Sequence, residues 1–165
     1  MQLLDGKKTS EDIKKEIAIE VQQMKDNGEK VPHLAAVIVG TDGASLTYVG
    51  SKVRSCQQIG FESTLVSLPE SITEAELLLK IKELNEDDNL DGYIVQLPLP
   101  KHIDEQKILM AIDPDKDVDG FHPANFGKMA LDMDTFTPAT PFGIMQLLER
   151  HKVDTVRKHT DLIGR

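Results

Sequence analysis

An unbroken apolar run early in the chain is the feature that most constrains its fold. The segment Leu34–Val39 reads Leu-Ala-Ala-Val-Ile-Val and ends at Gly40. A strand with one face in water alternates polar and apolar residues, whereas a strand buried on both faces is apolar throughout. Such strands belong to parallel sheets that carry helices on both sides. The run therefore predicts an α/β protein.

Helical and extended patterns alternate on both sides of this run. Ser10 is expected to cap a first helix that stops at Asn27–Gly28, and Thr73 with Glu76 forms a predicted capping box. The other expected helices cover 44–58, 73–84, 105–112 and 141–150, and the other expected strands cover 61–68, 93–96 and 160–164. The segment between the last two helices is expected to be a Gly- and Asp-rich loop. This order predicts a three-layer α/β/α fold with a small parallel sheet.

Composition narrows the class of protein. The 165 residues include 19 Lys+Arg and 28 Asp+Glu, a net charge of −9, which argues against a nucleic-acid partner. The single cysteine, Cys56, cannot form an internal disulfide and fits a reducing compartment. No apolar run reaches the roughly 18 residues needed to span a bilayer, and the start lacks a signal peptide. We therefore expect a cytoplasmic protein with no membrane partner.

Ligands of open α/β sheets bind where the strands end, and this rule selects three segments: 40–45, 96–100 and 116–120. The first of them, Gly-Thr-Asp-Gly-Ala-Ser, resembles a phosphate loop. It lacks both the Gly-Lys-Ser/Thr ending of a P-loop and the three-glycine dinucleotide fingerprint. A tight turn is the simpler interpretation, and a nucleotide-binding loop is the alternative.

Tyr48 and Lys52 lie four residues apart, on one face of the expected helix 44–58. A lysine ammonium can donate a hydrogen bond to a phenol or lie over its ring. A lysine removed from water can also exchange a proton near neutral pH. The alternative is an exposed lysine beside an amphipathic tyrosine, and spacing alone does not separate the two.

The residues of the other two segments also have more than one interpretation. Gln96 ends an apolar strand, where an amide needs partners, so it binds a ligand or holds the following loop. Leu97–Pro100 forms a rigid wall that suits a flat apolar ligand, or simply a stiff turn. Asp117 and Asp119 can act as paired carboxylates, cap their own turn, or accept two N–H groups from an amino-heterocycle. The five histidines are scattered, so we expect no metal site, and Cys56 suits packing.

Four segments, taken in order, resemble the signatures of the bifunctional methylenetetrahydrofolate dehydrogenase/methenyltetrahydrofolate cyclohydrolase family. They are 44–52, 91–100, 116–123 with Asn125 and Gly127, and 137–143. The resemblance covers the whole chain. It implies a tetrahydrofolate-binding catalytic domain followed by a Rossmann domain for NADP, with the active site in the cleft between them, in the one-carbon metabolism that serves purine biosynthesis.

The resemblance also implies roles for individual residues. Lys52 would be the central catalytic residue, which positions or deprotonates the water that hydrolyses the methenyl bridge. Tyr48 would stack on the folate and hold Lys52, Gln96 would orient Lys52, and Asp119 would anchor the pterin. The remaining implied residues would line the pocket: Val49, Val95, Leu97 and Pro98. No metal is implied.

The resemblance further predicts how the chain is divided. Residues 1–150 would form the tetrahydrofolate-binding domain, and 151–165 would start a truncated NAD(P)-binding domain, with Gly164 and Arg165 at its phosphate-contacting loop. We therefore expect the fragment to lack dehydrogenase activity. The family implies homodimers, and this fragment is expected to be monomeric. The sequence departs from the family at Ala139, Arg157 and Asp161.

Two other functions remain open at this point. The first is a folate-binding or regulatory module without catalysis, since the residues that would bind a folate do not by themselves establish turnover. The second is a nucleotide-binding phosphotransferase that uses residues 40–45, although no lysine follows that loop.

Overall fold

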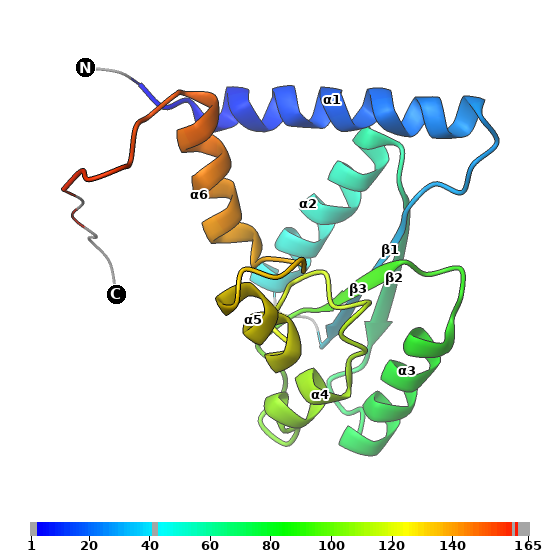
Figure 1. Ribbon diagram of the computed structural model, residues 1–165. Coiled ribbons are helices and arrows are strands. Elements are labelled where there is room, and N and C mark those ends of the chain that lie inside the picture. The colour runs from blue at the N-terminus through cyan, green and yellow to red at the C-terminus, as the bar shows by residue number, and fades with distance from the viewer. Residues whose placement is uncertain (1–2, 41–42, 160, 162–165) are drawn as a thin grey trace.

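A three-stranded parallel sheet forms the centre of the protein. The computed structural model describes residues 3–40, 43–159 and 161 (Figure 1). Strand β1 (His33–Val39) lies between β2 (Glu62–Leu68) and β3 (Gly92–Val95), with both neighbours parallel to it. Residues 35–39 of β1 are all buried, which confirms the prediction made from the apolar run. A single parallel bridge from Tyr93 to Asp117 continues the sheet beyond β3.

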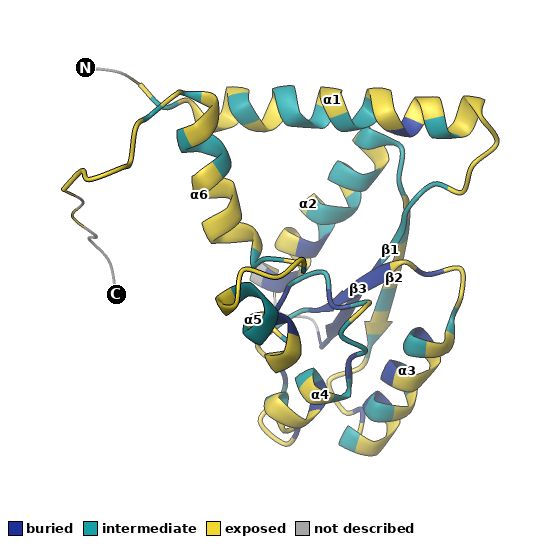
Figure 2. Cartoon of the chain, in the orientation of Figure 1, coloured by how far each residue is buried: buried dark blue, intermediate teal, exposed yellow. Residues whose placement is uncertain are grey.

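Helices cover both faces of the sheet, as predicted. Because side chains alternate along β1, Ala35 and Val37 pack with α3 (Glu74–Glu86) and α4 (Glu105–Ala111). Ala36 and Ile38 point to the other face, where they pack against Val49 of α2 (Gly43–Ile59). Figure 2 shows the buried residues gathered on the sheet and on the helix sides that face it. The fold is therefore a three-layer α/β/α arrangement.

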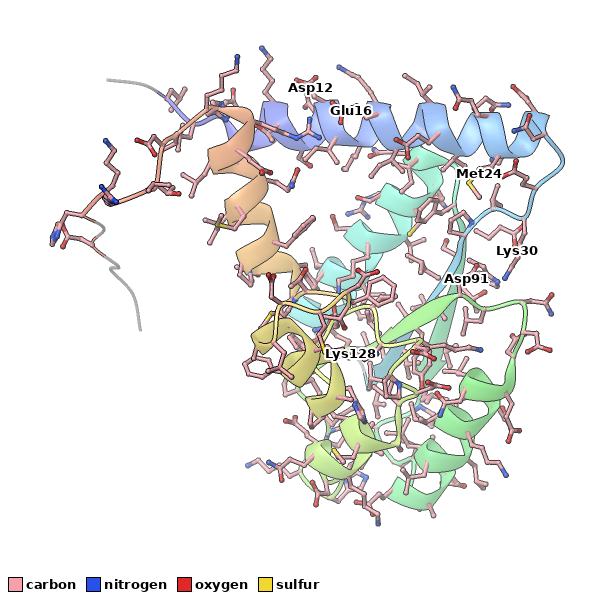
Figure 3. All side chains as sticks on the ribbon, in the orientation of Figure 1. Asp12, Glu16, Met24, Lys30, Asp91 and Lys128 are labelled. Carbon is pink, nitrogen blue, oxygen red and sulfur yellow. The ribbon has the colours of Figure 1, made fainter. Side chains whose placement is uncertain are left out.

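The remaining helices lie around this core. Helix α1 (Gly6–Asp26) crosses the end of α2, and α6 (Ala139–Arg150) extends from the end of α1 toward α5 (Pro123–Ala130) (Figure 1). The guanidinium of Arg150 donates to both carboxylate oxygens of Glu16, at 2.8 and 2.7 Å, and this pair fixes the C-terminal end of α6 on α1. Figure 3 shows Glu16 on the part of α1 next to α6. The other end of α6 is left close to the ends of the strands.

The starts of β1 and β3 are joined through Asp91. One of its carboxylate oxygens accepts from Lys30 Nζ at 2.7 Å, and the other accepts from the His33 backbone N–H at 2.7 Å (Figure 3). Asp91 immediately precedes β3, and His33 is the first residue of β1. These bonds fix the register of the two strands whose C-terminal ends approach the candidate site.

Local sequence signals give most boundaries correctly. The capping box is confirmed, because Thr73 Oγ1 accepts from Glu76 N at 3.2 Å and the Glu76 carboxylate accepts from Thr73 N at 2.8 Å. Helix α1 ends before Asn27 and Gly28, as predicted. The expected strand 160–164 lies outside the described residues, except for Asp161, which is in neither helix nor strand.

The clearest differences from the sequence-based expectation are two helix starts and one helix that was not predicted. Helix α1 begins at Gly6 rather than after Ser10, because the Asp5 side chain accepts from Lys8 N at 2.9 Å and caps the helix earlier. Helix α6 begins at Ala139, two residues before its expected start. Helix α5 was not predicted: it is short, and its one fully buried side chain is the polar Asn125, so no buried apolar residue marks it in the sequence. Within the described residues, no helix is long and apolar enough to cross a membrane.

Burial of α3 against the sheet gives a test of the core. Leu77 is fully buried, whereas Leu79, on the same helix, is 63% exposed. We predict that Leu77→Ala lowers the free energy of unfolding by about 2–5 kcal/mol, because it leaves a cavity in the core. Leu79→Ala is the matched control and should change it by less than about 0.5 kcal/mol. Urea denaturation measures both, and equal losses would contradict this packing.

Candidate functional site

Helix α2 places Tyr48 and Lys52 together at the ends of the strands. The Nζ atom of Lys52 lies 4.7 Å from the centroid of the Tyr48 ring, which is a cation–π contact. Tyr48 itself is 55% exposed, so one face of its ring remains open to a ligand or to water. The pair predicted from the spacing of four residues is therefore formed.

Asp119 faces the same lysine from a different part of the chain. Its Oδ1 atom lies 3.8 Å from Lys52 Nζ, and both side chains are partly buried, with 25% of the Asp119 and 31% of the Lys52 side chain exposed. Burial raises the pKa of the Asp119 carboxyl above its ordinary value, because a charge is costly away from water. The nearby Lys52 ammonium opposes this shift, and the Asp117 carboxylate adds to it. Asp119 is thus a carboxylate held in a poorly hydrated place with one cation beside it.

Asp117 and Asp119, two residues apart in one loop, have separate surroundings. Asp117 is 2% exposed, and its Oδ2 atom accepts from the His122 backbone N–H at 2.8 Å and from Asn125 Nδ2 at 3.1 Å. Asp119 instead lines a cavity beside Lys52. Of the three interpretations of this pair, capping of its own turn describes Asp117, whereas Asp119 faces a cavity and its role as a ligand acceptor stays a prediction.

A cavity of about 350 Å³, the Gln96 cavity, opens beside this cluster. The end of β3 supplies one wall through Val95, Gln96 and Leu97, and the start of α6 supplies another through residues 138–141. The Gln96 amide nitrogen donates to the Leu97 carbonyl oxygen at 2.7 Å, which holds the amide along this wall. Gln96 and Lys52 thus line one cavity, while the role of Gln96 in orienting Lys52 stays a prediction.

A second hollow of about 390 Å³, the Cys56 cavity, lies between α2 and the sheet. It shares Tyr48, Lys52 and Asp119 with the Gln96 cavity, and most of its other lining is apolar or carries small hydroxyl groups. Burial raises the pKa of the Cys56 thiol, which lowers its reactivity and fits a packing role. The Tyr48–Lys52–Asp119 cluster therefore stands where two hollows meet.

Some expected pocket residues lie elsewhere. Val49 is buried in the core between α2 and the sheet. Pro98 is exposed and follows a cis peptide bond. Neither lines the Gln96 or the Cys56 cavity. Gly164 and Arg165, expected to contact a cofactor, lie outside the described residues.

Two parts of the lining of the Gln96 cavity were not predicted as site residues from the sequence. Phe121 follows the Asp119 loop, and the segment 138–141 begins α6; both line the Gln96 cavity. The signal for the second was present, because it falls in the fourth segment that resembled the family. Within the described residues, no group of three or more His, Cys, Asp or Glu side chains is placed to hold a metal ion.

Together these features define an α/β domain with a small-molecule site at the C-terminal edge of its sheet. A family model described as the tetrahydrofolate dehydrogenase/cyclohydrolase catalytic domain matches residues 4–119. The chain belongs to this family, as the four sequence segments predicted.

Known relatives agree with this assignment. The chain is 81% identical over all 165 residues to the "Bifunctional protein FolD" of Flavobacterium johnsoniae and 53% identical to that of Bacteroides fragilis, and it covers 56% of each relative. It superposes on the Campylobacter jejuni FolD methylenetetrahydrofolate dehydrogenase/cyclohydrolase with a TM-score of 0.89 and 46% identity, over 93% of this chain and 55% of that one. For the Trypanosoma brucei enzyme, solved with NADP and an inhibitor, the TM-score is 0.84 and the identity is 33%. This match covers 90% of this chain and 51% of that one. The chain thus spans about half the length of these relatives.

The surroundings of Asp119 give a test that needs no ligand. We predict that its carboxyl titrates above the ordinary aspartate value of about 3.9, because burial disfavours the charged form. Lys52→Met should raise the midpoint further, because the cation that favours the carboxylate is removed. Carbon-13 NMR of the Asp119 carboxyl measures both midpoints, with the exposed Lys101→Met as the matched control. A midpoint that did not rise in Lys52→Met would show that the lysine does not stabilise the carboxylate.

Proposed function

We propose that residues 1–150 form the tetrahydrofolate-binding domain of a bifunctional methylenetetrahydrofolate dehydrogenase/methenyltetrahydrofolate cyclohydrolase. The observation that carries this proposal is the position of Lys52, between the ring of Tyr48 and the carboxylate of Asp119 at the mouth of the Gln96 cavity. This arrangement offers an aromatic face, a carboxylate and a proton-carrying group within one site.

Each of these groups matches one part of a folate. A pterin is a flat heterocycle with an amino group beside a ring N–H, and a single carboxylate can accept from both. Asp119 is suited to this task because it is poorly hydrated and faces the cavity. The half-exposed Tyr48 ring gives the adjoining aromatic part of the ligand a surface for stacking. Leu97 adds an apolar wall.

Hydrolysis of the methenyl bridge requires proton transfer, and Lys52 is placed to provide it. The bridging carbon belongs to a resonance-stabilised cation. When the oxygen of water bonds to that carbon, one proton must leave the water, and a proton must reach the ring nitrogen as the carbon–nitrogen bond breaks. We propose that Lys52 Nζ positions the water and, as the unprotonated amine, takes its proton and passes it to the ring nitrogen, with Tyr48 and Asp119 holding the side chain in place.

Oxidation of the methylene bridge makes a different demand on the site. A hydride leaves the same carbon, so the step depends on orientation rather than on an acid or a base. NADP would supply the hydride acceptor, and its diphosphate needs a glycine-rich turn at the start of a helix. The two cavities have no glycine in their lining, and their lysine already faces a carboxylate. The lining of these two cavities therefore suits the folate and does not suit the diphosphate.

Substitution of Lys52 tests the catalytic role. We predict that Lys52→Ala lowers the hydrolysis of methenyltetrahydrofolate by about 10²–10⁴-fold, the usual contribution of a positioned proton-transfer group. The assay is the loss of methenyltetrahydrofolate absorbance, in a hybrid in which this chain replaces the matching residues of the Flavobacterium johnsoniae relative. Reduction of NADP by the same hybrid should fall by a smaller factor, because hydride transfer needs no proton carrier.

The exposed Lys101→Ala is the matched control for this experiment and should hydrolyse at the unsubstituted rate. Normal hydrolysis in Lys52→Ala would remove the assigned role. A hybrid that binds folate but performs neither reaction would instead favour the folate-binding or regulatory module without catalysis.

Substitution of Asp119 tests substrate recognition separately. Asp119→Asn keeps the shape of the side chain but replaces one acceptor oxygen by an amide. We expect the affinity for folinic acid, a stable reduced folate, to fall about 10- to 100-fold, the range for a lost hydrogen bond to a charged group. Calorimetric titration of this chain measures the affinity, and the exposed Asp115→Asn is the matched control. Unchanged affinity in Asp119→Asn would exclude the carboxylate as the pterin anchor.

A further inference from the structure

Asn125 is a buried polar side chain whose contacts all lie around the Asp119 loop. It is 1% exposed and sits in α5, the helix that was not predicted. Its Nδ2 atom donates to the Pro114 carbonyl oxygen at 2.8 Å and to Asp117 Oδ2 at 3.1 Å. Its Oδ1 atom accepts from Thr135 Oγ1 at 3.0 Å. The amide thus uses both of its donors and its acceptor, so a full set of contacts repays its burial.

These bonds hold the loop on the N-terminal side of Asp119. Asp117, which Asn125 contacts, also pairs with Tyr93 in the bridge next to β3, and Tyr93 N donates to the Lys116 carbonyl oxygen at 2.9 Å. The backbone around Gly92 approaches so closely that an added Cβ would lie 2.3 Å from Val118. The residues just before Asp119 are therefore packed on β3 and fixed from the other side by Asn125.

The loop is also held on the C-terminal side of Asp119. Gly120 has a φ of +67°, and a Cβ at this position would lie 2.6 Å from the Phe136 carbonyl oxygen. Phe136 follows Thr135, the residue that donates to Asn125, and precedes the segment 138–141 that walls the Gln96 cavity. Asn125 thus connects the Asp119 loop with the chain that leads into the opposite wall of the site.

We propose that Asn125 is a positioning residue, which acts through Asp117 and Thr135 to fix the position of the Asp119 carboxylate relative to the 138–141 wall. This proposal rests on the proposed function, in which Asp119 anchors the pterin. Lys52 is carried by α2 and contacts this network only through Asp119. Loss of Asn125 should therefore weaken folate binding more than it slows the chemistry at Lys52.

The proposal requires the donors and the acceptor of an asparagine at position 125, and not only a side chain of the same size. Asn125→Asp keeps the shape but replaces the amide that donates to the Pro114 carbonyl and to Asp117 by an acceptor oxygen, and it places a carboxylate against the Asp117 carboxylate. Asn125→Ala removes all three bonds. Thr135→Val removes a single hydroxyl at nearly constant shape, so it tests the same network if the Asn125 variants fail to fold.

The first experiment follows Asp119 without any folate. The carboxyl of Asp119 is titrated by carbon-13 NMR in the unsubstituted chain, in Asn125→Ala and in Thr135→Val. The groups that face it, Lys52 and Asp117, remain in all three proteins. In the variants the midpoint should move down toward the ordinary value of about 3.9, because a released loop exposes the carboxyl to water. An unchanged midpoint in both folded variants would overturn the proposal, whatever the protein binds.

The second experiment is a double-mutant cycle on folinic acid affinity. Asn125→Ala should weaken binding about tenfold or more, since a small misplacement of a positioned group can cost on the order of 10²-fold. In an Asp119→Asn background the same substitution should cost little further affinity, because the group that it positions is already impaired. An equal loss in both backgrounds would show that Asn125 does not act through Asp119.

Two controls separate the possible failures. Leu77→Ala lowers stability from α3, which contributes no residue to either cavity, so its folded fraction should keep the unsubstituted affinity and Asp119 midpoint. If the unsubstituted chain does not bind folinic acid, the proposed function fails, while the titration still decides whether Asn125 positions Asp119.

Discussion

The burial of β1 on both faces is the constraint on which the rest of the structure depends. A strand without a face in water must have helices above and below it and a paired strand on each side. Parallel pairing brings the C-terminal ends of β1 and β3 to one edge, and the bridge at Asp117 brings a third segment there. Helix α2, which packs on one face of β1, then presents Lys52 at this edge. The position of the site thus follows from the parallel pairing of β1 and from the packing of α2 on one of its faces.

Removal of water decides how the polar groups at this edge behave. Lys52 and Asp119 are 3.8 Å apart, a separation at which two exposed charges would interact weakly. Here burial outweighs the attraction, and the pKa of Asp119 is raised rather than lowered. A carboxylate in this state gains more from two ligand N–H groups than a hydrated one would, because the ligand replaces solvation that the fold has withdrawn.

Elements with a periodic or capped sequence were predictable, and so was their order. The strand 34–39, the capping box at Thr73 and the helix that carries Tyr48 and Lys52 each have a local signal that tertiary packing reinforces. Pairing between Lys52 and Asp119 was not predictable from spacing, since the two residues are far apart in the sequence and meet only through the sheet edge. The proposed roles of these residues came from the family resemblance and not from periodicity.

Helix α5 shows most clearly why part of the site escapes sequence reasoning. Helix prediction follows apolar residues at helical spacing, but the fully buried side chain of α5 is an asparagine, and the helix is specified by His122 at its N-cap and by Pro123 in its first turn. The energetic reason for Asn125 lies in three partners on other segments, Pro114, Asp117 and Thr135. An apolar residue there would leave the buried Asp117 carboxylate with fewer donors, and an aspartate would repel it. A buried amide of this kind contributes geometric specificity to a loop, and that specificity can be recognised only once the partners are assembled.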